Sequence, residues 1–452
     1  MLELSKDYSV AVDGTEIEVR DIRVSAYPIN QLYQGYQRPL EQTEIAGLAS
    51  FDIEKRVYVT VKTAKTVERV EIRPRTYGIE PEILDEHTVG FYLDKPVMCS
   101  VEINDYHSCL HLFANKPAQK PQNCTYFAKG IHDIGIMQLE SNQHIYLEEG
   151  AILFGRMEAN GIENVCIEGR GIICASKHED RRKMISFINC KNIRMEGVIL
   201  CDAGEWTAIF AGCQEVSLEN LKLVGMWRYN ADGIDLVNSQ NVRVADCYIR
   251  TFDDCVTVKG FPQHSDKNCK NIEICGCIAW CDWGRAFEIG AETCAATMED
   301  IHFHDCIVVR TQDVALDIQH TDYADIKRVT FEKIIVEENE RTWRTKLQEY
   351  EGQVYEPDES DNYRPVLITL EIKKNMWTSS KEFGTIEDVT FSDITAPSDL
   401  AIQLIGANSE HLIQNVTFRD FHFTDGGYPE ISMKFAKDIH ILQTKHTEGE
   451  KL

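Results

Sequence analysis

The sequence has no hydrophobic stretch that approaches the length of a membrane span, and it does not start with a basic region followed by an apolar core. We therefore expect a cytoplasmic protein. An excess of positive charge is also absent, because 47 Lys and Arg residues are opposed by 73 Asp and Glu residues and the formal net charge is −26. Since this charge repels phosphate backbones and anionic lipid surfaces, neither nucleic acid nor a membrane is expected as a partner.

The cysteines do not form the compact framework of a small disulfide-rich domain. Thirteen of the 16 lie between Cys166 and Cys306, scattered along the chain, and we expect them to be buried free thiols. Cys275 and Cys277 stand two residues apart, but no second Cys or His pair follows at the spacing of a zinc finger. The sequence therefore predicts no metal site and no other cofactor.

Residues 1–125 contain no internal repeat. Short runs of alternating apolar and polar residues occur at 57–61, 70–73 and 100–103, separated by polar or Pro/Gly segments. Strict alternation in short runs is typical of half-buried antiparallel strands, so we predict a β-sandwich domain. The aromatic residues between 27 and 36 are expected to pack in its core and an adjoining loop.

Residues 126–452 form the second predicted domain, in which a repeat runs from about 140 to 435. Each unit begins with a short β segment bounded by Asn or Asp, and the first apolar residues of these segments are Val165, Ile193, Val216, Val242, Ile272, Ile301, Val329, Val389 and Val416. Their spacings are 28, 23, 26, 30, 29, 28, 60 and 27 residues, and the spacing of 60 corresponds to two units with an insertion at 337–363. A fixed period of this length is typical of a solenoid.

The composition of the repeat distinguishes between types of solenoid. The units are rich in β-branched residues at alternate positions and show no helical periodicity, and the fixed Leu and Asn positions of leucine-rich repeats are missing. We predict an all-β fold in which a right-handed parallel β-helix follows the sandwich.

Consecutive units can be aligned on their inward-facing residues. The predicted core positions of one parallel sheet are Ile234, Val256, Phe287 and Leu316. Because alternate residues of a strand face opposite sides, the outward row beside them is Asp235, Thr257, Glu288 and Asp317. Asp232, Asp254 and Arg285 are aligned just before these strands. Adjacent strands are about 4.8 Å apart, so Asp232 and Asp254 should be close neighbours.

Asn230-Ala231-Asp232 and Asp253-Asp254 therefore bring three carboxylates together at one-coil spacing. Carboxylates this close cannot all ionise at their ordinary pKa values, so one holds a proton near neutral pH while the others stay charged. An acid and a base in one site are what glycoside hydrolysis requires. Asp and Asn also populate β-helix turns without any catalytic role, but the paired motifs on aligned strands favour a site.

These motifs resemble those of the family 28 glycoside hydrolases, whose best-known members are polygalacturonases, and which are related to the dextranase and isopullulanase group. The family carries Asn-Thr-Asp, then Asp-Asp one coil later, as this chain does at 230–232 and 253–254. The resemblance implies that Asp253 is the general acid, that Asp232 and Asp254 activate the water, and that the reaction inverts the anomeric centre. It covers residues 140–435, and residues 1–125 look like the additional domain of the dextranase group.

Two later motifs of the family are changed in this chain. Gly284-Arg285-Ala286 replaces Gly-His-Gly, and Asp317-Ile318-Gln319 replaces the Arg-Ile-Lys with which pectin-degrading members bind a uronate carboxylate. Arg285 should lower the pKa of neighbouring carboxylates. Because an acid and an amide replace two cations, we predict a neutral oligosaccharide as the substrate, trimmed from a chain end. Arg285, Arg228 and Lys259 keep a uronate substrate possible.

The predicted substrate-binding residues lie on the same coils as the carboxylates. They are Trp206, Arg228, Asp235, Lys259, Arg285, Glu288, Glu292, Asp317, Gln319 and His320. Trp280 and Trp283 are further candidates for stacking on sugar rings. Two other functions remain open, a calcium-dependent polysaccharide lyase that uses an Arg or Lys as base and a carbohydrate-binding β-helix without catalysis. The sequence is equally compatible with a monomer and a homo-oligomer.

Overall fold

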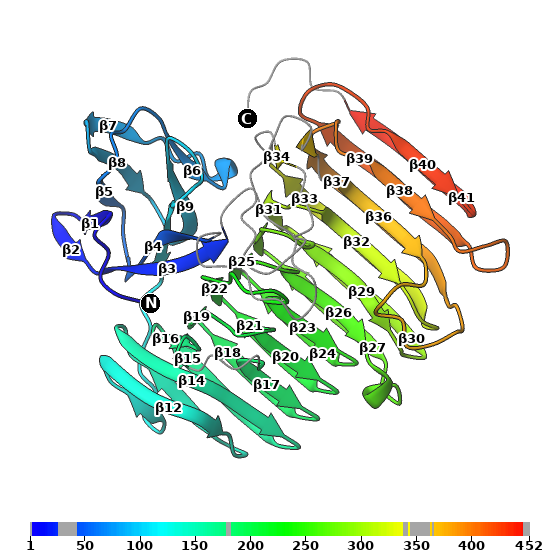
Figure 1. Ribbon diagram of the computed structural model, residues 1–452, viewed down its shortest axis with the longest axis horizontal. Helices are drawn as coiled ribbons and strands as arrows, with labels where there is room; N and C mark the ends of the chain where they lie inside the picture. Colours follow the sequence, from blue (N-terminus) through cyan, green and yellow to red (C-terminus); the bar gives the residue numbers. More distant parts are fainter. Residues whose placement is uncertain are drawn as a thin grey trace, which may run out of the picture.

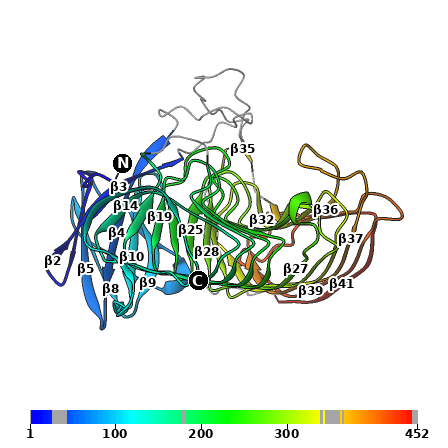
Figure 2. The same ribbon diagram turned by 90° about the horizontal axis from the view of Figure 1, so that it is seen from below.

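A computed structural model describes residues 2–25, 43–177, 182–337, 342–343, 362–363 and 366–445 of the chain. A β-sandwich lies beside the first coils of a long solenoid, and the last coils, β36 to β41, extend away from it (Figures 1 and 2). The only described helices are two 3-10 turns, η2 (Arg75–Tyr77) and η3 (Pro262–His264). No helix among the described residues is long and apolar enough to cross a membrane.

The sandwich consists of two five-stranded sheets that enclose one apolar core. One sheet contains β1 (Tyr8–Val12), β2 (Thr15–Ile17), β5 (Val57–Thr63), β7 (Glu82–Asp85) and β8 (Thr88–Leu93). The other contains β3 (Val19–Ser25), β4 (Thr43–Asp52), β6 (Val70–Arg73), β9 (Val97–Ile103) and β10 (Leu110–Asn115). All pairs are antiparallel except β4 with β10, which run parallel. The aromatic run at 27–36 lies outside the described residues.

The solenoid begins with β11 (Thr125–Phe127) and β12 (Gly130–Gln138) and is a parallel β-helix, as predicted. Its strands form three parallel faces. The first, which we call the site sheet, contains β17 (Ile185–Ile188), β20 (Ala208–Ala211), β23 (Ile234–Val237), β26 (Val256–Gly260), β29 (Phe287–Thr293), β32 (Val314–His320), β36 (Val366–Ile372), β38 (Ile402–Ile405) and β40 (Ile431–Lys434).

The second face, the outer sheet, contains β13 (His144–Leu147), β15 (Glu163–Gly169), β18 (Lys191–Glu196), β21 (Gln214–Glu219), β24 (Gln240–Ala245), β27 (Cys269–Cys275), β30 (Thr297–His304), β33 (Asp325–Val336), β37 (Thr385–Ala396), β39 (Ile413–Phe423) and β41 (Ala436–Lys445). The third face contains β16 (Ile172–Cys174), β19 (Ile199–Cys201), β22 (Lys222–Val224), β25 (Tyr248–Thr251), β28 (Ile278–Cys281) and β31 (Ile307–Arg310). Strand β14 (Ala151–Asn160) bends from the third face onto the site sheet.

The strand register confirms the predicted repeat except at the spacing of 60 residues, which was wrongly predicted to be two units. Val329 pairs directly with Val389, so this spacing is a single coil that carries the long insertion. Each of the nine anchor residues from Val165 to Val416 pairs with the next one along the outer sheet. On the site sheet Ile234 pairs with Val256, Val256 with Phe287 and Phe287 with Leu316, and all four side chains are fully buried. Stacked apolar side chains from successive coils therefore fill the interior of the solenoid.

Asparagine explains why the units begin as they do. Asn164 and Asn192 adopt the left-handed backbone conformation, which Asn tolerates better than most residues, and so turn the chain between faces. The Asn192 side chain donates to Asn164 (2.8 Å), and the Asn164 side chain donates to Asn142 (2.9 Å). The Asn positions thus form a hydrogen-bonded ladder along the edge of the coils.

All 16 cysteines are free, and 14 of them are buried, which confirms the predicted free thiols. The third face of the solenoid packs against the sandwich through one apolar cluster, which includes Phe113, Tyr248 and Trp280. The insertion at 337–363 lies mostly outside the described residues; β34 (Thr342–Trp343) pairs antiparallel with β35 (Asn362–Tyr363).

Candidate active site

A cavity of about 470 Å³ opens on the outward side of the site sheet. It lies over the turns that precede β23, β26 and β29. The Gly233 amide donates to the Asp254 carbonyl (2.8 Å) and the Cys255 amide donates to the Arg285 carbonyl (2.9 Å), so these turns are stacked as predicted. The predicted site residues that line the cavity are Trp206, Asp232, Asp253, Asp254, Lys259, Arg285, Glu288, Glu292 and Gln319.

Gly284 allows two of the carboxylates to approach the turn in front of them. A Cβ atom at this position would lie 2.5 Å from Oδ1 of Asp253 and 2.5 Å from Oδ1 of Asp254, which is closer than non-bonded atoms can come. The sequence therefore needs glycine here because of space rather than backbone conformation. Both carboxylates converge on one point at the wall of the cavity.

The two adjacent carboxylates differ in their protonation. Burial and the charge of Asp254 raise the pKa of Asp253 well above its ordinary value, although Arg285 and Lys259 oppose this. Burial also acts on Asp254, but the charges of Arg285 and Lys259 outweigh it and lower the pKa of this residue. Asp253 therefore holds a proton under conditions in which Asp254 is charged.

Asp232 differs from the expectation that it is charged together with Asp254. Burial and the charges of Asp235 and Asp253 raise the pKa of Asp232 well above its ordinary value. Its Oδ2 lies 4.0 Å from the Lys259 ammonium, whereas no described residue donates a hydrogen bond to its Oδ1. The surroundings therefore favour the protonated form of Asp232 and Asp253 and the charged form of Asp254.

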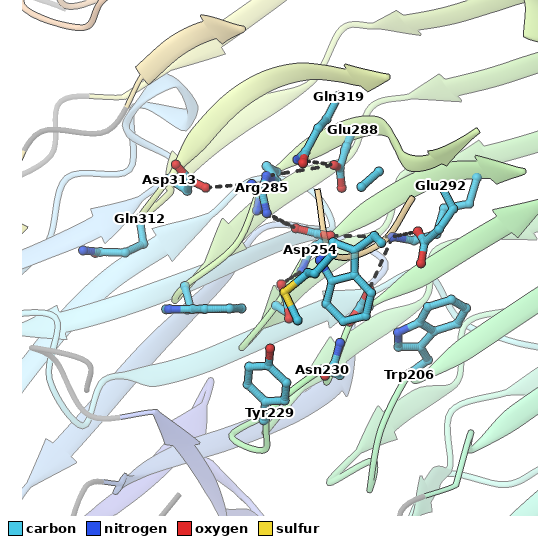
Figure 3. A pocket seen from close by; sticks show the side chains of 17 residues that line it. Trp206, Tyr229, Asn230, Asp254, Arg285, Glu288, Glu292, Gln312, Asp313 and Gln319 are labelled. Carbon is cyan, nitrogen blue, oxygen red and sulfur yellow. Dashed lines mark hydrogen bonds and ion pairs between the residues drawn. The ribbon is translucent and has the colours of Figure 1, made fainter. Parts of the chain in front are cut away.

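Lys259 and Arg285 hold the carboxylates in place, and Figure 3 shows Arg285 between Asp254 and Asp313. The Lys259 ammonium lies 3.8 Å from Asp254 and 3.6 Å from Glu292, in addition to Asp232. The Arg285 backbone amide donates to Asp254 (2.8 Å), and its guanidinium lies 3.9 Å from that carboxylate. Both cations are thus committed to acidic neighbours before any substrate binds.

Arg285 also connects the turn to the row beneath it. Its guanidinium lies 3.1 Å from Asp313, 3.2 Å from Asp317 and 3.9 Å from Glu288. Glu288 accepts a weak hydrogen bond from the Gln319 side-chain amide (3.5 Å), and a hydrogen bond between the Glu288 and Asp254 carboxyl groups helps to lower the pKa of Asp254. Burial and the charge of Asp254 raise the pKa of Glu288 well above its ordinary value.

Four of the predicted substrate-binding residues do not line the cavity. Asp235 and Asp317 are in the predicted outward row but are covered, at 0% and 2% exposure, and burial raises the pKa of each to about 7. Asp235 accepts a hydrogen bond from Thr257 (3.0 Å), and Asp317 pairs with Arg285. Asp235 and Asp317 thus lie in the predicted row but not at the wall of the cavity, because the alignment gives the direction of a side chain and not what covers it.

Arg228 and His320, also predicted to bind substrate, do not line the cavity either. Arg228 forms an ion pair with Asp202, and its guanidinium lies 4.3 Å above the ring of Trp227. His320 is fully buried, its Nδ1 lies 2.7 Å from the Thr293 hydroxyl, and burial lowers its pKa to about 3. Both side chains are used within the protein.

The aromatic residues near the site have separate roles. Trp206 and Trp283 line the cavity together with Tyr229, and Trp283 stacks on Phe252 at 5.4 Å. Trp280 faces the sandwich instead, at 2% exposure, so the prediction that it stacks on a sugar was wrong.

A loop between β36 and β37 contributes residues that sequence reasoning missed. Met376 and Trp377 line the cavity, although they follow Asp254 by more than a hundred positions. The loop is attached to the coil below, since the Asn375 amide donates to Gln319 (2.7 Å) and two backbone amides, of Ser379 and Ser380, donate to Asp322 (2.8 and 2.7 Å). Gln312 and Asp313 also line the cavity. Sequence reasoning missed them because, like the loop, they lie outside the aligned strands.

Residues 150–342 match the family model described as Glycosyl hydrolases family 28, which confirms the resemblance predicted from the motifs. A probable polygalacturonase of Arabidopsis thaliana is 29% identical over 164 residues, which are 35% of this chain and 32% of that protein. An exopolygalacturonase of the same plant is 28% identical over 160 residues, 34% of this chain and 36% of that protein. The chain thus spans about a third of the length of these relatives.

Solved structures share the fold at low sequence identity. An exopolygalacturonase from Thermotoga maritima has a TM-score of 0.55 at 12% identity and covers 70% of this chain and 83% of its own. Dex49A from Penicillium minioluteum has the same TM-score and identity, and the match covers 87% of this chain and 89% of Dex49A. A family 28 exopolygalacturonase from Yersinia enterocolitica has a TM-score of 0.50 at 13% identity, and the match covers 99% of this chain and 95% of that enzyme. These similarities confirm the β-helix fold.

Proposed function

We propose that this protein is a glycoside hydrolase that cleaves an oligosaccharide with inversion of the anomeric centre. The observation that carries the proposal is the contrast between Asp253 and Asp254, which meet at Gly284 with pKa values displaced in opposite directions. A protonated and a charged carboxyl group in one cavity supply the acid and the base that hydrolysis needs.

Each carboxyl group has a defined part in this reaction. Asp253 donates its proton to the glycosidic oxygen as the bond from that oxygen to the anomeric carbon breaks. A water molecule attacks the anomeric carbon from the opposite side and transfers a proton to Asp254, and the Asp232 carboxyl group accepts a hydrogen bond from its other hydrogen. Asp253 ends charged and Asp254 protonated, and exchange with solvent restores both.

We further propose a neutral sugar as the substrate. Among the described residues, the cavity is lined by six carboxyl side chains, Asp232, Asp253, Asp254, Glu288, Glu292 and Asp313, and by two cations, Lys259 and Arg285. Each cation is already shared by at least three carboxyl groups, so a uronate would add an anion without gaining a free partner. Sugar hydroxyls, in contrast, can donate to carboxyl oxygens that line the cavity without adding a charge.

Action at a chain end is favoured by the shape of the site. A cavity of about 470 Å³ is in the range of pockets for small ligands rather than of long grooves, and Met376 and Trp377 of the β36–β37 loop wall it. The structural relatives described as exopolygalacturonases support the same mode of action.

The test is to incubate the protein with neutral α-linked oligosaccharides and with oligogalacturonides of similar length. Products are followed by mass spectrometry and anomer-resolved NMR, with Asp253→Asn as the inactive control. We expect one sugar to be released at a time from the neutral chains, with inverted configuration. Faster cleavage of the uronides would favour the polygalacturonase-type reaction, and retained configuration would contradict the roles given to the aspartates.

A polysaccharide lyase is the second candidate that the same experiment addresses. Its product is unsaturated and absorbs ultraviolet light, and its activity would be lost on chelation of calcium. The cavity carboxylates are instead paired with Lys259 and Arg285, which favours hydrolysis.

A further inference from the structure

A second cluster of reactive side chains lies on the outer sheet, away from the cavity on the site sheet. Glu273 and Cys275 stand two residues apart on β27, so they face the same side. The strand register places Cys275 opposite His304 and Glu273 opposite His302 on β30. A carboxylate oxygen of Glu273, Sγ of Cys275 and a ring nitrogen of His304 all lie within 4.8 Å of one another.

His304 is held between two carboxylates. Its Nδ1 lies 2.6 Å from Oδ2 of Asp305, and its Nε2 lies 3.1 Å from Oε1 of Glu273. A neutral imidazole has only one N–H, so if Nδ1 donates to Asp305, the lone pair of Nε2 points at an anionic oxygen. That contact is favourable only if a second proton or another cation lies between the two atoms.

Arg243 supplies an outer partner for the other two side chains. Its Nε lies 2.9 Å from Oε2 of Glu273, which leaves Oε1 directed at His304. Its second terminal nitrogen lies 3.4 Å from Sγ of Cys275, where a positive charge stabilises a thiolate. Asp305 is the outer partner of His304, as Arg243 is of Glu273 and Cys275. Outer partners of this kind, above all a carboxylate behind a histidine, orient the ligands of protein metal sites.

We propose that Glu273, Cys275 and His304 bind one divalent transition-metal ion of the zinc type. Nitrogen, sulfur and oxygen ligands together suit a cation of borderline softness such as Zn²⁺ or Co²⁺. The bound ion takes the place of the proton between His304 and Glu273 and joins β27 to β30 in the next coil. His302, whose ring centroid lies 4.3 Å from that of His304, or a water molecule completes the coordination.

The cluster corrects the interpretation of the Cys-x-Cys pair. Cys277 turns into the solenoid, where its thiol lies 3.4 Å from the Cys275 carbonyl, so the two cysteines do not act together. The partner of Cys275 is supplied by the next coil, and no finger-like spacing reveals it. Because a metal binds the thiolate rather than the thiol, binding should release protons and weaken as the pH falls.

His144, Cys166 and Glu168 provide a comparison on the same sheet. Their ligand atoms also lie within 4.8 Å of one another, and Nε2 of His144 lies 2.7 Å from Oε1 of Glu168. The described residues give His144 no carboxylate that corresponds to Asp305. We therefore expect the first cluster to bind more tightly, and the second serves as the internal control.

The experiment uses the full chain, freed of metal with a chelator and titrated with Co²⁺. A cobalt–thiolate bond gives a charge-transfer absorption band, and its saturation gives the stoichiometry. We expect one equivalent whose band is lost in Cys275→Ser and in His304→Gln and is kept in Cys166→Ser and Cys124→Ser. Asp305→Asn should bind roughly 10- to 100-fold more weakly, the usual effect of an outer partner, and Zn²⁺ should displace the cobalt.

Three results would overturn the proposal: no thiolate band in the unaltered protein, a band that persists in Cys275→Ser, or a band that only Cys166→Ser removes. Because the His304 side chain is partly exposed, the His304→Gln variant should fold like the unaltered protein. Circular dichroism checks this. Zn²⁺ should also raise the Tm of the unaltered protein but not that of His304→Gln, because binding to the folded state alone stabilises it.

Discussion

Charge is buried in two regions of this protein, the contact between sandwich and solenoid and the proposed active site, and the two regions are built differently. At the contact, Arg310 binds Glu102 through two hydrogen bonds (2.6 and 2.7 Å), and Arg73 binds Glu337 at 2.8 Å. Arg310 and Arg73 lower the pKa of Glu102 in spite of its burial. Glu102 and Glu337 therefore each have a close cation, although Arg73 also lies 3.5 Å from Glu102 and 3.3 Å from Glu71.

At the site the acids outnumber the cations. Among the described residues, six carboxyl side chains line the cavity, whereas the two cations Lys259 and Arg285 are each shared by several of them. Buried acids in excess of cations lower the free energy of unfolding. The comparison teaches that balanced buried charge marks a structural contact, whereas an excess of one sign marks a place prepared for a ligand.

Asp253→Asn should have the largest effect on catalysis. Loss of the proton donor should lower kcat by roughly 10²- to 10⁴-fold, the usual contribution of general acid catalysis, while substrate affinity is kept. Because the pKa of Asp253 is raised on folding, its charged form opposes folding as the pH rises above the ordinary carboxyl value, and Asn removes this effect. Kinetics and thermal denaturation at neutral pH should therefore show an inactive protein of equal or higher Tm. Near-normal turnover would show that Asp253 is not the general acid and that a neighbouring carboxyl group has this role.

Arg310→Met should show the opposite behaviour. Glu102 would keep only the longer contact with Arg73 at 3.5 Å, and breaking a buried ion pair lowers the free energy of unfolding by about 3 to 5 kcal/mol. Urea denaturation should show this loss, and kcat per folded molecule should stay unchanged. Arg310→Met with Glu102→Leu should recover much of the stability; failure to recover any would mean that the pair matters through packing alone.

Gly284→Ala tests the close approach at the site. The new Cβ would displace both Asp253 and Asp254, and a displacement near 1 Å typically costs about 10²-fold in rate. Gly47→Ala is the matched control, since its Cβ would lie 2.9 Å from Leu110 in the sandwich. Equal kcat/KM in the two variants would contradict the placement of the carboxylates.

Arg285→Gln should displace the pH dependence of kcat/KM. Activity needs Asp254 charged and Asp253 protonated, so it should persist below the ordinary Asp pKa and decline as the pH rises through the raised pKa of Asp253. Removal of the Arg285 charge raises both pKa values, and both limbs of the profile should move to higher pH. An unmoved acidic limb would exclude Asp254 as the base.

Trp377→Ala should have the smallest effect. Loss of an aromatic contact with a sugar ring typically costs about 0.5 to 1.5 kcal/mol, so we expect KM to rise a few-fold with little change in kcat. Trp377→Phe should keep most of the affinity. Michaelis–Menten kinetics on the best neutral substrate measures this, and an unchanged KM in the Ala variant would exclude the loop from binding.

The fold could be predicted from the sequence because every coil must bury apolar side chains at the same positions. Val242, Ile272 and Ile301 recur at similar spacing because stacked coils must bury the same positions, and the strand register follows from them. The motifs at 230–232 and 253–254 were found in the same way. Asp317 shows the limit of the method, since a row that faces outward from the coil is not thereby exposed.

The sequence by itself thus determined the coil, its inward residues and the meeting of Asp232, Asp253 and Asp254, since all of these follow from the period of the repeat. Only the tertiary structure decided which outward residues reach a ligand. Trp377 joins the site through a loop that Asp322 and Gln319 hold, and Cys275 meets His304 from the next coil. Contacts between such distant segments depend on loop paths and side-chain packing, which no local pattern records.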